Sequence, residues 1–335
     1  MTHVQAARTS YHLPTPTANV DEAKRNMDIH GCAILRGLIT PAQLAALRNR
    51  VEEQAQLERR HGVAFFARPE LGDHPTKGPL YHHQGMRIGR PIAEPTFQSV
   101  RFLANKGRVF IELCKHPVLL ELARHTLGEN FYVGSTAAIV LRNGAPAQFI
   151  HRDQAVLPFD TPAPVMLNVF IALRDYTAQM GATLVAPGSH LDPPPVYRID
   201  DNGNKTIQGF DTDRLQPAEM KAGDVLLFDS KLLHGQGASI SDEERWVISI
   251  IYSAHWWRSQ DVYVASLLDE VYDTLTPEEL ALFGFEVVRH GAGSITPTRP
   301  SSRRYNSNVQ LPYIPELRSD SDAKPVPADA VVEEW

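Results

Sequence analysis

The stretch PVMLNVFIALRD, residues 164–175, indicates the fold class of this chain. It is rich in β-branched and aromatic residues, and similar short runs recur from about residue 131 onward, separated by clusters of Gly, Pro, Asn and Asp. The other runs are FYVGSTAAIVLR (131–142), QFIHRD (148–153), GATLVAPGSH (181–190), DVLLFD (224–229) and RWVISIIYSAHW (245–256). Short, evenly spaced strands of this kind predict an antiparallel sandwich or barrel.

The part of the chain before these strands is predicted to be helical. In TPAQLAALRNRVEEQAQLERR, Thr40 is a suitable N-cap, Pro41 fits the first helical position and Gln43 completes a capping box. The run VFIELCKHPVLLELARHTLG (109–128) predicts further helix, interrupted before Pro117. Helices followed by strands indicate one α+β domain built on a β core.

We expect three parts along the chain. Residues 1–18 form an extended N-terminal segment, residues 19–290 form the domain, and residues 291–335 form an extended C-terminal tail rich in Pro, Ser and Arg. Within the domain, residues 61–100 mix Gly, Pro, His and aromatics without a clear period, which is typical of a lid. TPEELALFGF (276–285) predicts a short capped helix near the end of the domain.

Composition excludes several classes of protein. The net charge of -6 and the lack of basic clusters argue against a nucleic-acid partner or an anionic membrane surface. The two cysteines, Cys32 and Cys114, lie in apolar surroundings and predict neither a disulfide framework nor a cysteine zinc site. With no signal peptide and no long apolar run, we expect a soluble, cytoplasmic protein.

Three polar residues among the predicted strands can form a metal site. His151 and Asp153 lie two residues apart, so a strand that continued through them would direct both to one face. His234 follows an apolar run and precedes Gly235 and Gly237, which allow a close backbone approach. Two imidazole nitrogens and one carboxylate oxygen are the facial triad that leaves open positions on Fe(II).

Arg245 adds a candidate anion receptor to this set. It lies 245 − 234 = 11 residues after His234 and opens the apolar run WVISIIYSA. An arginine directed into a core needs an anionic partner, and its planar fork suits a carboxylate. The alternative is a surface arginine paired with Asp242, Glu243 or Glu244. An isolated H-x-D pair also occurs by chance, and histidine in an apolar context is more often a core residue than a ligand.

These motifs together resemble the phytanoyl-CoA dioxygenase (PhyH) family of Fe(II)/2-oxoglutarate-dependent oxygenases. The resemblance rests on HRD at 151–153, GATLVAPGSH at 181–190, and the spacing of His234 and Arg245. DIHGCAILRGLITPAQLAALR also looks like the opening of that family, so the similarity spans about residues 20–285. It implies a double-stranded β-helix, or jelly roll, flanked by helices. The HRD form and the TPEELALFGF helix are similar to the secondary-metabolism members of the family.

The resemblance also implies a metal and a co-substrate. His151, Asp153 and His234 would hold Fe(II), and Arg245 would bind the distal carboxylate of 2-oxoglutarate. O2 would be the second co-substrate, with succinate and CO2 released. Related halogenases have Gly or Ala in place of the carboxylate ligand, so the presence of Asp153 favours hydroxylation or another oxidative outcome.

Three further residues resemble positions that assist co-substrate binding. They are Thr183 in GATLVAPGSH, Gln148 before the H-x-D pair, and Asn168 in the run MLNVFIALRD. The alternative for Thr183 is a strand-end threonine, and for the other two it is a polar side chain hydrogen-bonded to the backbone.

Apolar residues near the motifs predict an enclosure for a substrate. We expect it to be lined by Phe65, Tyr81, Phe159, Met166 and Trp256. The net negative charge of the chain provides no obvious binding site for the phosphates of a CoA thioester, and the C-terminal EEW is not a peroxisomal signal.

We therefore expect a small, largely apolar natural product as substrate, oxidised by hydroxylation, desaturation, cyclisation or endoperoxide formation. Alternatives are an acyl-CoA hydroxylase of the same family, a non-catalytic jelly-roll binding protein, and a zinc hydrolase. A homodimer is compatible with the sequence, since loops from a second copy would complete a pocket.

Overall fold

The large sheet organises the molecule. The computed structural model describes residues 12–61, 63–67, 86–89, 95–157, 159–199, 205–258 and 260–285. The strands of the sheet are β1 (Cys32–Leu35), β2 (Ala64–Ala67), β3 (Met86–Gly89), β4 (Phe97–Arg101), β5 (Phe131–Leu141), β6 (Met166–Ala172), β11 (Val225–Asp229) and β13 (Arg245–Ala254). They pair antiparallel in the order β1-β11-β6-β13-β5-β4-β2-β3.

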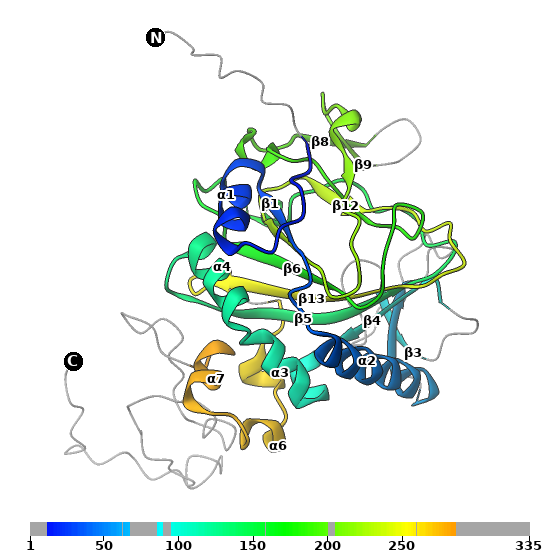
Figure 1. The fold of residues 1–335 in the computed structure, drawn as a ribbon, viewed down its shortest axis with the longest axis vertical. Helices are drawn as coiled ribbons and strands as arrows, with labels where there is room; N and C mark the ends of the chain where they lie inside the picture. Colours follow the sequence, from blue (N-terminus) through cyan, green and yellow to red (C-terminus); the bar gives the residue numbers. More distant parts are fainter. Residues whose placement is uncertain are drawn as a thin grey trace, which may run out of the picture.

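A small second sheet and a hairpin carry the rest of the β structure in the described residues. The sheet has the order β10-β7-β12, and its strands are β7 (Thr183–Val185), β10 (Gln216–Pro217) and β12 (His234–Gln236). Strands β8 (Tyr197–Ile199) and β9 (Lys205–Ile207) form the hairpin. In Figure 1, β12 and the hairpin lie on one side of the large sheet, and α3 (Arg108–Cys114) and α7 (Pro277–Leu282) lie on the other.

The helices include those that the sequence signals predict in the segments 40–60, 109–128 and 276–285. They are α1 (Val20–His30), α2 (Pro41–His61), α3 (Arg108–Cys114), α4 (Pro117–Leu127), α5 (Tyr263–Ser266), α6 (Asp269–Tyr272) and α7 (Pro277–Leu282). At the start of α2, the Thr40 N–H donates to the Gln43 side chain, and the predicted break before Pro117 separates α3 from α4. Figure 1 shows α2, α3 and α4 along one side of the large sheet. No helix in the described part of the chain has the length and apolar character that crossing a membrane requires.

The central strands are buried on both faces. Val169 and Ile171 of β6 belong to the core that the helices cover. Phe170 and Ala172, which alternate with them, belong to the core shared with β7. Burial on both faces explains why these strands read as almost continuous apolar runs. Strand alternation places Asn168 on the same face as Phe170, toward the small sheet. The fold is therefore an α+β jelly roll, as expected.

The segment 61–100 differs from the prediction of an irregular region. It contributes β2, β3 and most of β4 to one end of the large sheet. These strands have only four or five residues each, too few for an alternating pattern to stand out. The role of a lid for this segment stays a prediction.

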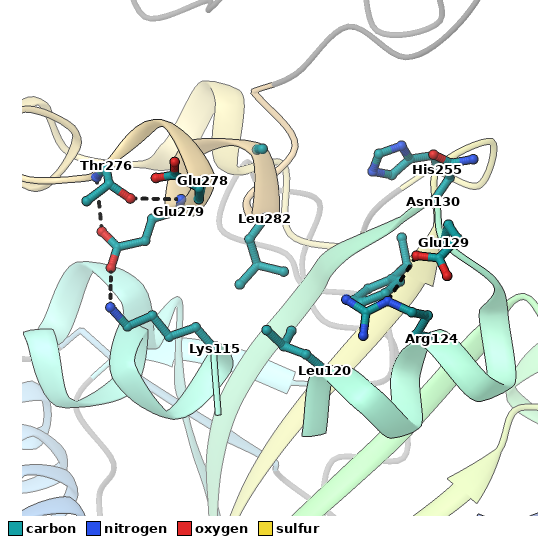
Figure 2. Close-up of a pocket in the computed structure, with 12 residues that line it drawn as sticks. Lys115, Leu120, Arg124, Glu129, Asn130, His255, Thr276, Glu278, Glu279 and Leu282 are labelled. Atoms are coloured by element: carbon teal, nitrogen blue, oxygen red, sulfur yellow. Dashed lines mark hydrogen bonds and ion pairs between the residues drawn. The ribbon is translucent and has the colours of Figure 1, made fainter. Parts of the chain in front are cut away.

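Glu279 connects α7 to the helical layer, as Figure 2 shows. Its carboxylate accepts hydrogen bonds from Lys115 (2.7 Å), Arg108 and the Thr276 N–H, and its side chain is buried. Burial by itself opposes ionisation, but the hydrogen bonds from Arg108 and Lys115 lower the pKa of Glu279 to about 2.

Replacing Glu279 by glutamine is expected to lower the free energy of unfolding by about 1–3 kcal/mol at neutral pH. Because the pKa is depressed in the folded state, this contribution is complete above the ordinary value of 4.5 and is lost as the pH falls toward about 2. Urea unfolding of both proteins over this pH range measures the difference. The exposed neighbour Glu278 provides the matched control, Glu278→Gln, and an equal effect of both changes would contradict the assignment.

Candidate metal centre

Three side chains from two segments that are distant in sequence converge at the edge of the small sheet. His151 Nε2 lies 3.5 Å from Asp153 Oδ1, and His234 Nε2 lies 3.6 Å from Asp153 Oδ2. The three possible ligand atoms all lie within 4.8 Å of one another. Two nitrogens and one hard oxygen at this spacing suit a non-haem Fe(II) ion with open coordination positions.

Both imidazoles are held in the tautomer that a metal requires. His151 Nδ1 is 2.9 Å from the Phe149 carbonyl oxygen, and His234 Nδ1 is 3.0 Å from the Leu232 carbonyl oxygen. A carbonyl accepts only, so each Nδ1 carries the proton and each Nε2 presents a lone pair toward Asp153. Burial also lowers the pKa of His234, which favours its neutral form.

The H-x-D segment does not continue as the strand that the sequence suggested. His151 forms an isolated antiparallel bridge with His234, and Asp153 begins a short 3-10 helix, Asp153–Val156. A Cβ added at Gly235 would lie 3.2 Å from the Phe149 carbonyl oxygen, so the absence of a side chain lets the two segments pair. The close approach expected at Gly235 is therefore between its own backbone and the backbone at Phe149.

Asn168 orients the carboxylate of the triad. Its Nδ2 donates to Asp153 Oδ2 at 2.8 Å, and its side chain is buried on β6. Burial by itself would raise the pKa of Asp153, but the neighbouring imidazoles of His234 and His151, in their protonated form, and the hydrogen bond from Asn168 lower it to about 2. Asp153 is therefore ionised and ready to bind a cation. The sequence alone did not suggest this contact for Asn168.

Asn168→Ala is expected to weaken metal binding by about 10–100-fold, because the carboxylate loses the donor that fixes its direction. Titration of the apoprotein with Co(II), followed by its visible absorption, measures this affinity. Thermal unfolding of the apoprotein separates a loss of fold from a loss of metal. Wild-type metal affinity in a folded Asn168→Ala variant would contradict this role.

Arg245 fits an anionic co-substrate. Its side chain is 2% exposed at the start of β13, and burial lowers its pKa to about 10. One guanidinium nitrogen donates to the Gly181 carbonyl, and the guanidinium lies 5.4 Å from the centre of the Tyr176 ring. In the described part of the chain, Nε has no hydrogen-bond partner. Among the described residues, no carboxylate forms an ion pair with it. A buried cation with an unused donor fits the distal carboxylate of 2-oxoglutarate.

The other residues predicted to contact the co-substrate occupy different surroundings. Thr183 is buried on β7, two residues after Gly181, whose carbonyl accepts from Arg245. Gln148 is exposed, and its Oε1 accepts from the Gln236 N–H at 3.2 Å, which fastens its segment to β12. Contact of either residue with 2-oxoglutarate stays a prediction.

The predicted substrate residues are scattered. Met166 is buried on β6 two residues before Asn168, whereas Phe159 and Trp256 are 59% and 62% exposed. Phe65 is half-buried on β2, which β4, β5 and β13 separate from β6. Tyr81 lies outside the described residues.

Two aromatic residues at the candidate site were not predicted from the sequence. The Phe149 ring lies 5.0 Å from the His151 ring, between ring centres. Strand alternation provided a signal for it, because Phe149 precedes His151 by two residues. Tyr176 is buried, its ring centre lies 5.4 Å from the Arg245 guanidinium, and no pattern in its sequence neighbourhood pointed to it.

The cavity in Figure 2 is separate from this centre. It has a volume of about 530 Å³ and lies between α4, α7 and the adjoining ends of β5 and β13. Neither the triad residues nor Arg245 line it, and four of its charges are paired within its wall, Lys115 with Glu279 and Arg124 with Glu129.

Two solved structures with the same fold contain a metal, Fe3+ in one and nickel in the other, together with 2-oxoglutarate. The epimerase SnoN, in complex with Fe3+, alpha ketoglutarate and nogalamycin RO, aligns with a TM-score of 0.54 at 17% identity, covering 83% of this chain and 96% of that one. HygX from Streptomyces hygroscopicus, with nickel and 2-oxoglutarate bound, aligns with a TM-score of 0.52 at 16% identity, covering 72% and 89%. Because the sequence identities are this low, the structural similarity supports the jelly-roll fold and nothing further.

Sequence comparison gives the family. "Dioxygenase af480" of Aspergillus fumigatus is 26% identical over 269 residues, covering 78% of this chain and 76% of the relative. "Dioxygenase aneA" of Aspergillus aculeatus is 28% identical over 259 residues, covering 74% and 76%. The class is that of the non-haem iron, 2-oxoglutarate-dependent dioxygenases. The profile of the phytanoyl-CoA dioxygenase (PhyH) family matches residues 27–247, and the chain belongs to this family.

Proposed function

We propose that this dioxygenase oxidises a small, largely apolar natural product, with His151, Asp153 and His234 as the ligands of Fe(II). Arg245 binds the distal carboxylate of 2-oxoglutarate, and turnover releases succinate and CO2. The observation that carries the proposal is the convergence of the three ligand atoms within 4.8 Å, together with a buried arginine for which the described residues provide no anionic partner.

The known proteins with this fold support a natural-product substrate. SnoN is described as an epimerase from nogalamycin biosynthesis, and HygX has been solved with hygromycin B. In this chain, exposed Phe149 beside His151 offers an apolar surface next to the metal position. A substrate that packs on this ring would place a C–H bond near the open coordination positions.

The residues of this chain bind and orient, and the bound groups supply the oxidation. Iron with 2-oxoglutarate and O2 supplies the oxidising power for a substrate C–H bond. Asn168 fixes the direction of the Asp153 carboxylate, and two backbone carbonyls fix the His151 and His234 rings. Arg245 fixes the far end of 2-oxoglutarate and so its orientation toward the metal. No general base is required.

A screen of natural products for substrate-dependent succinate release tests the proposal. Compounds with an apolar skeleton are expected to raise succinate production above the rate with 2-oxoglutarate alone, and mass spectrometry identifies the oxidised product. A panel of acyl-CoA thioesters provides the competing class. Succinate release with the thioesters alone would replace this proposal by that of an acyl-CoA hydroxylase.

A further inference from the structure

The β8–β9 hairpin is anchored to the segment that carries two of the proposed metal ligands. The Arg152 N–H, between His151 and Asp153 in the sequence, donates to the Tyr197 hydroxyl of β8 at 3.1 Å. Figure 1 shows the hairpin on the side of the large sheet that also carries β12, the strand of His234. The hairpin therefore flanks the candidate metal centre.

Lys205 of β9 bridges the hairpin and the metal-binding segment. Its Nζ lies 4.5 Å from the centre of the Phe149 ring and 4.4 Å from the centre of the Tyr197 ring. The Phe149 ring in turn lies 5.0 Å from the His151 ring. Contact with two aromatic faces restricts where the ammonium group can lie, and so holds a positive charge one aromatic ring away from a metal ligand.

No described residue accepts a hydrogen bond from this ammonium. An ammonium group has three donors, and a ring face attracts the charge but accepts no ordinary hydrogen bond. In the parts of the chain that the structure describes, no carboxylate pairs with Lys205, and its side chain is exposed, as is 45% of Phe149. The cation and the ring are therefore both exposed, side by side, next to His151.

We propose that Lys205 is a specificity-determining residue that pairs with a carboxylate of the substrate, while the apolar body of the substrate packs on Phe149. This inference rests on the proposed function and narrows its substrate class to apolar acids. Arg245 does not compete for this role, because it is 2% exposed and its guanidinium lies against Gly181 and Tyr176. The chain thus has one buried cation for the co-substrate and one exposed cation for the substrate.

The test uses two probes of the same shape, 2-naphthoate and the neutral 2-naphthamide. Isothermal titration of the full chain, anaerobic with Fe(II) and saturating 2-oxoglutarate, gives a Kd for each probe. The wild type is expected to prefer the naphthoate by about tenfold or more, and Lys205→Met to lose this preference through weaker naphthoate binding. Lys205→Arg, which keeps the charge and the stacking on aromatic rings, is expected to retain it. Lys221→Met, at an exposed lysine paired with Asp175, is the matched control.

Several results would overturn the inference. One is a wild type that does not prefer the acid, and another is a Lys205→Met variant that still does. If Lys205→Met weakens both probes equally, Lys205 only fastens the hairpin to Phe149 and Tyr197. If it weakens 2-oxoglutarate binding, Lys205 belongs to the co-substrate site instead.

Failure of this inference is distinguishable from failure of the proposed function. The same samples are examined for the visible absorption band of the anaerobic complex of Fe(II) and 2-oxoglutarate. A wild type without this band would reject the metal and co-substrate assignment, whatever the affinities for the two probes. An intact band in both proteins, together with a probe preference that does not depend on Lys205, would reject only the role of Lys205.

Discussion

Arg245→Leu is expected to weaken 2-oxoglutarate binding by about 2–5 kcal/mol, because the co-substrate carboxylate would be buried without its partner charge. The unliganded fold is expected to tolerate the change, since leucine removes a buried cation that has no anionic partner among the described residues. Isothermal titration of the anaerobic Fe(II) protein with 2-oxoglutarate measures the difference.

Two controls make this result specific to Arg245. Arg142, which pairs with Glu244, provides the control variant Arg142→Leu at a second arginine outside the site. Titration of the Arg245→Leu variant with Co(II) shows whether the metal site is intact. Unchanged 2-oxoglutarate affinity in Arg245→Leu would remove this residue from the co-substrate site.

His234→Ala is expected to weaken metal binding strongly, because it removes a ligand. The loss of a residue that only supports a ligand typically weakens metal binding by about 10–100-fold, and we expect a larger effect here. His234 is buried, and its Nε2 is one of the two imidazole nitrogens that face Asp153. Equilibrium dialysis against Fe(II) under argon, with metal analysis of the protein, measures the affinity.

A histidine outside the triad serves as the control for this prediction. His125 is on α4 and pairs with Asp28, so His125→Ala is expected to bind metal as the wild type does. If His234→Ala retains metal while its fold is unchanged, the ion is held by other residues and the triad is wrong.

The sequence predicted the strands and helices whose signals are local. Continuous apolar runs marked β6, β11 and β13, and capping residues marked the starts of α2 and α7. The short strands in segment 61–100 escaped prediction, since pairing with β5 through β4, and not a local pattern, places them in the sheet. Short strands of this kind depend on tertiary contacts that one sequence does not display.

The candidate site also contains some residues that the sequence predicted and others that only the fold brings together. His151, Asp153, His234 and Arg245 were found because their residue types and spacing resemble a known family. The contact of Asn168 with Asp153 depends on how β6 lies beneath the H-x-D segment, which spacing alone does not give. Lys205 is 54 residues from His151 (205 − 151), and only the hairpin fold brings it to Phe149.

The most direct measurement of the central claim is the visible spectrum of the anaerobic protein after addition of Fe(II) and 2-oxoglutarate. Chelation of the metal by the co-substrate inside the triad predicts a charge-transfer band in the wild type, and its loss in His151→Ala. A wild type without the band, or a His151→Ala variant that keeps it, would contradict the claim that these side chains hold one iron ion.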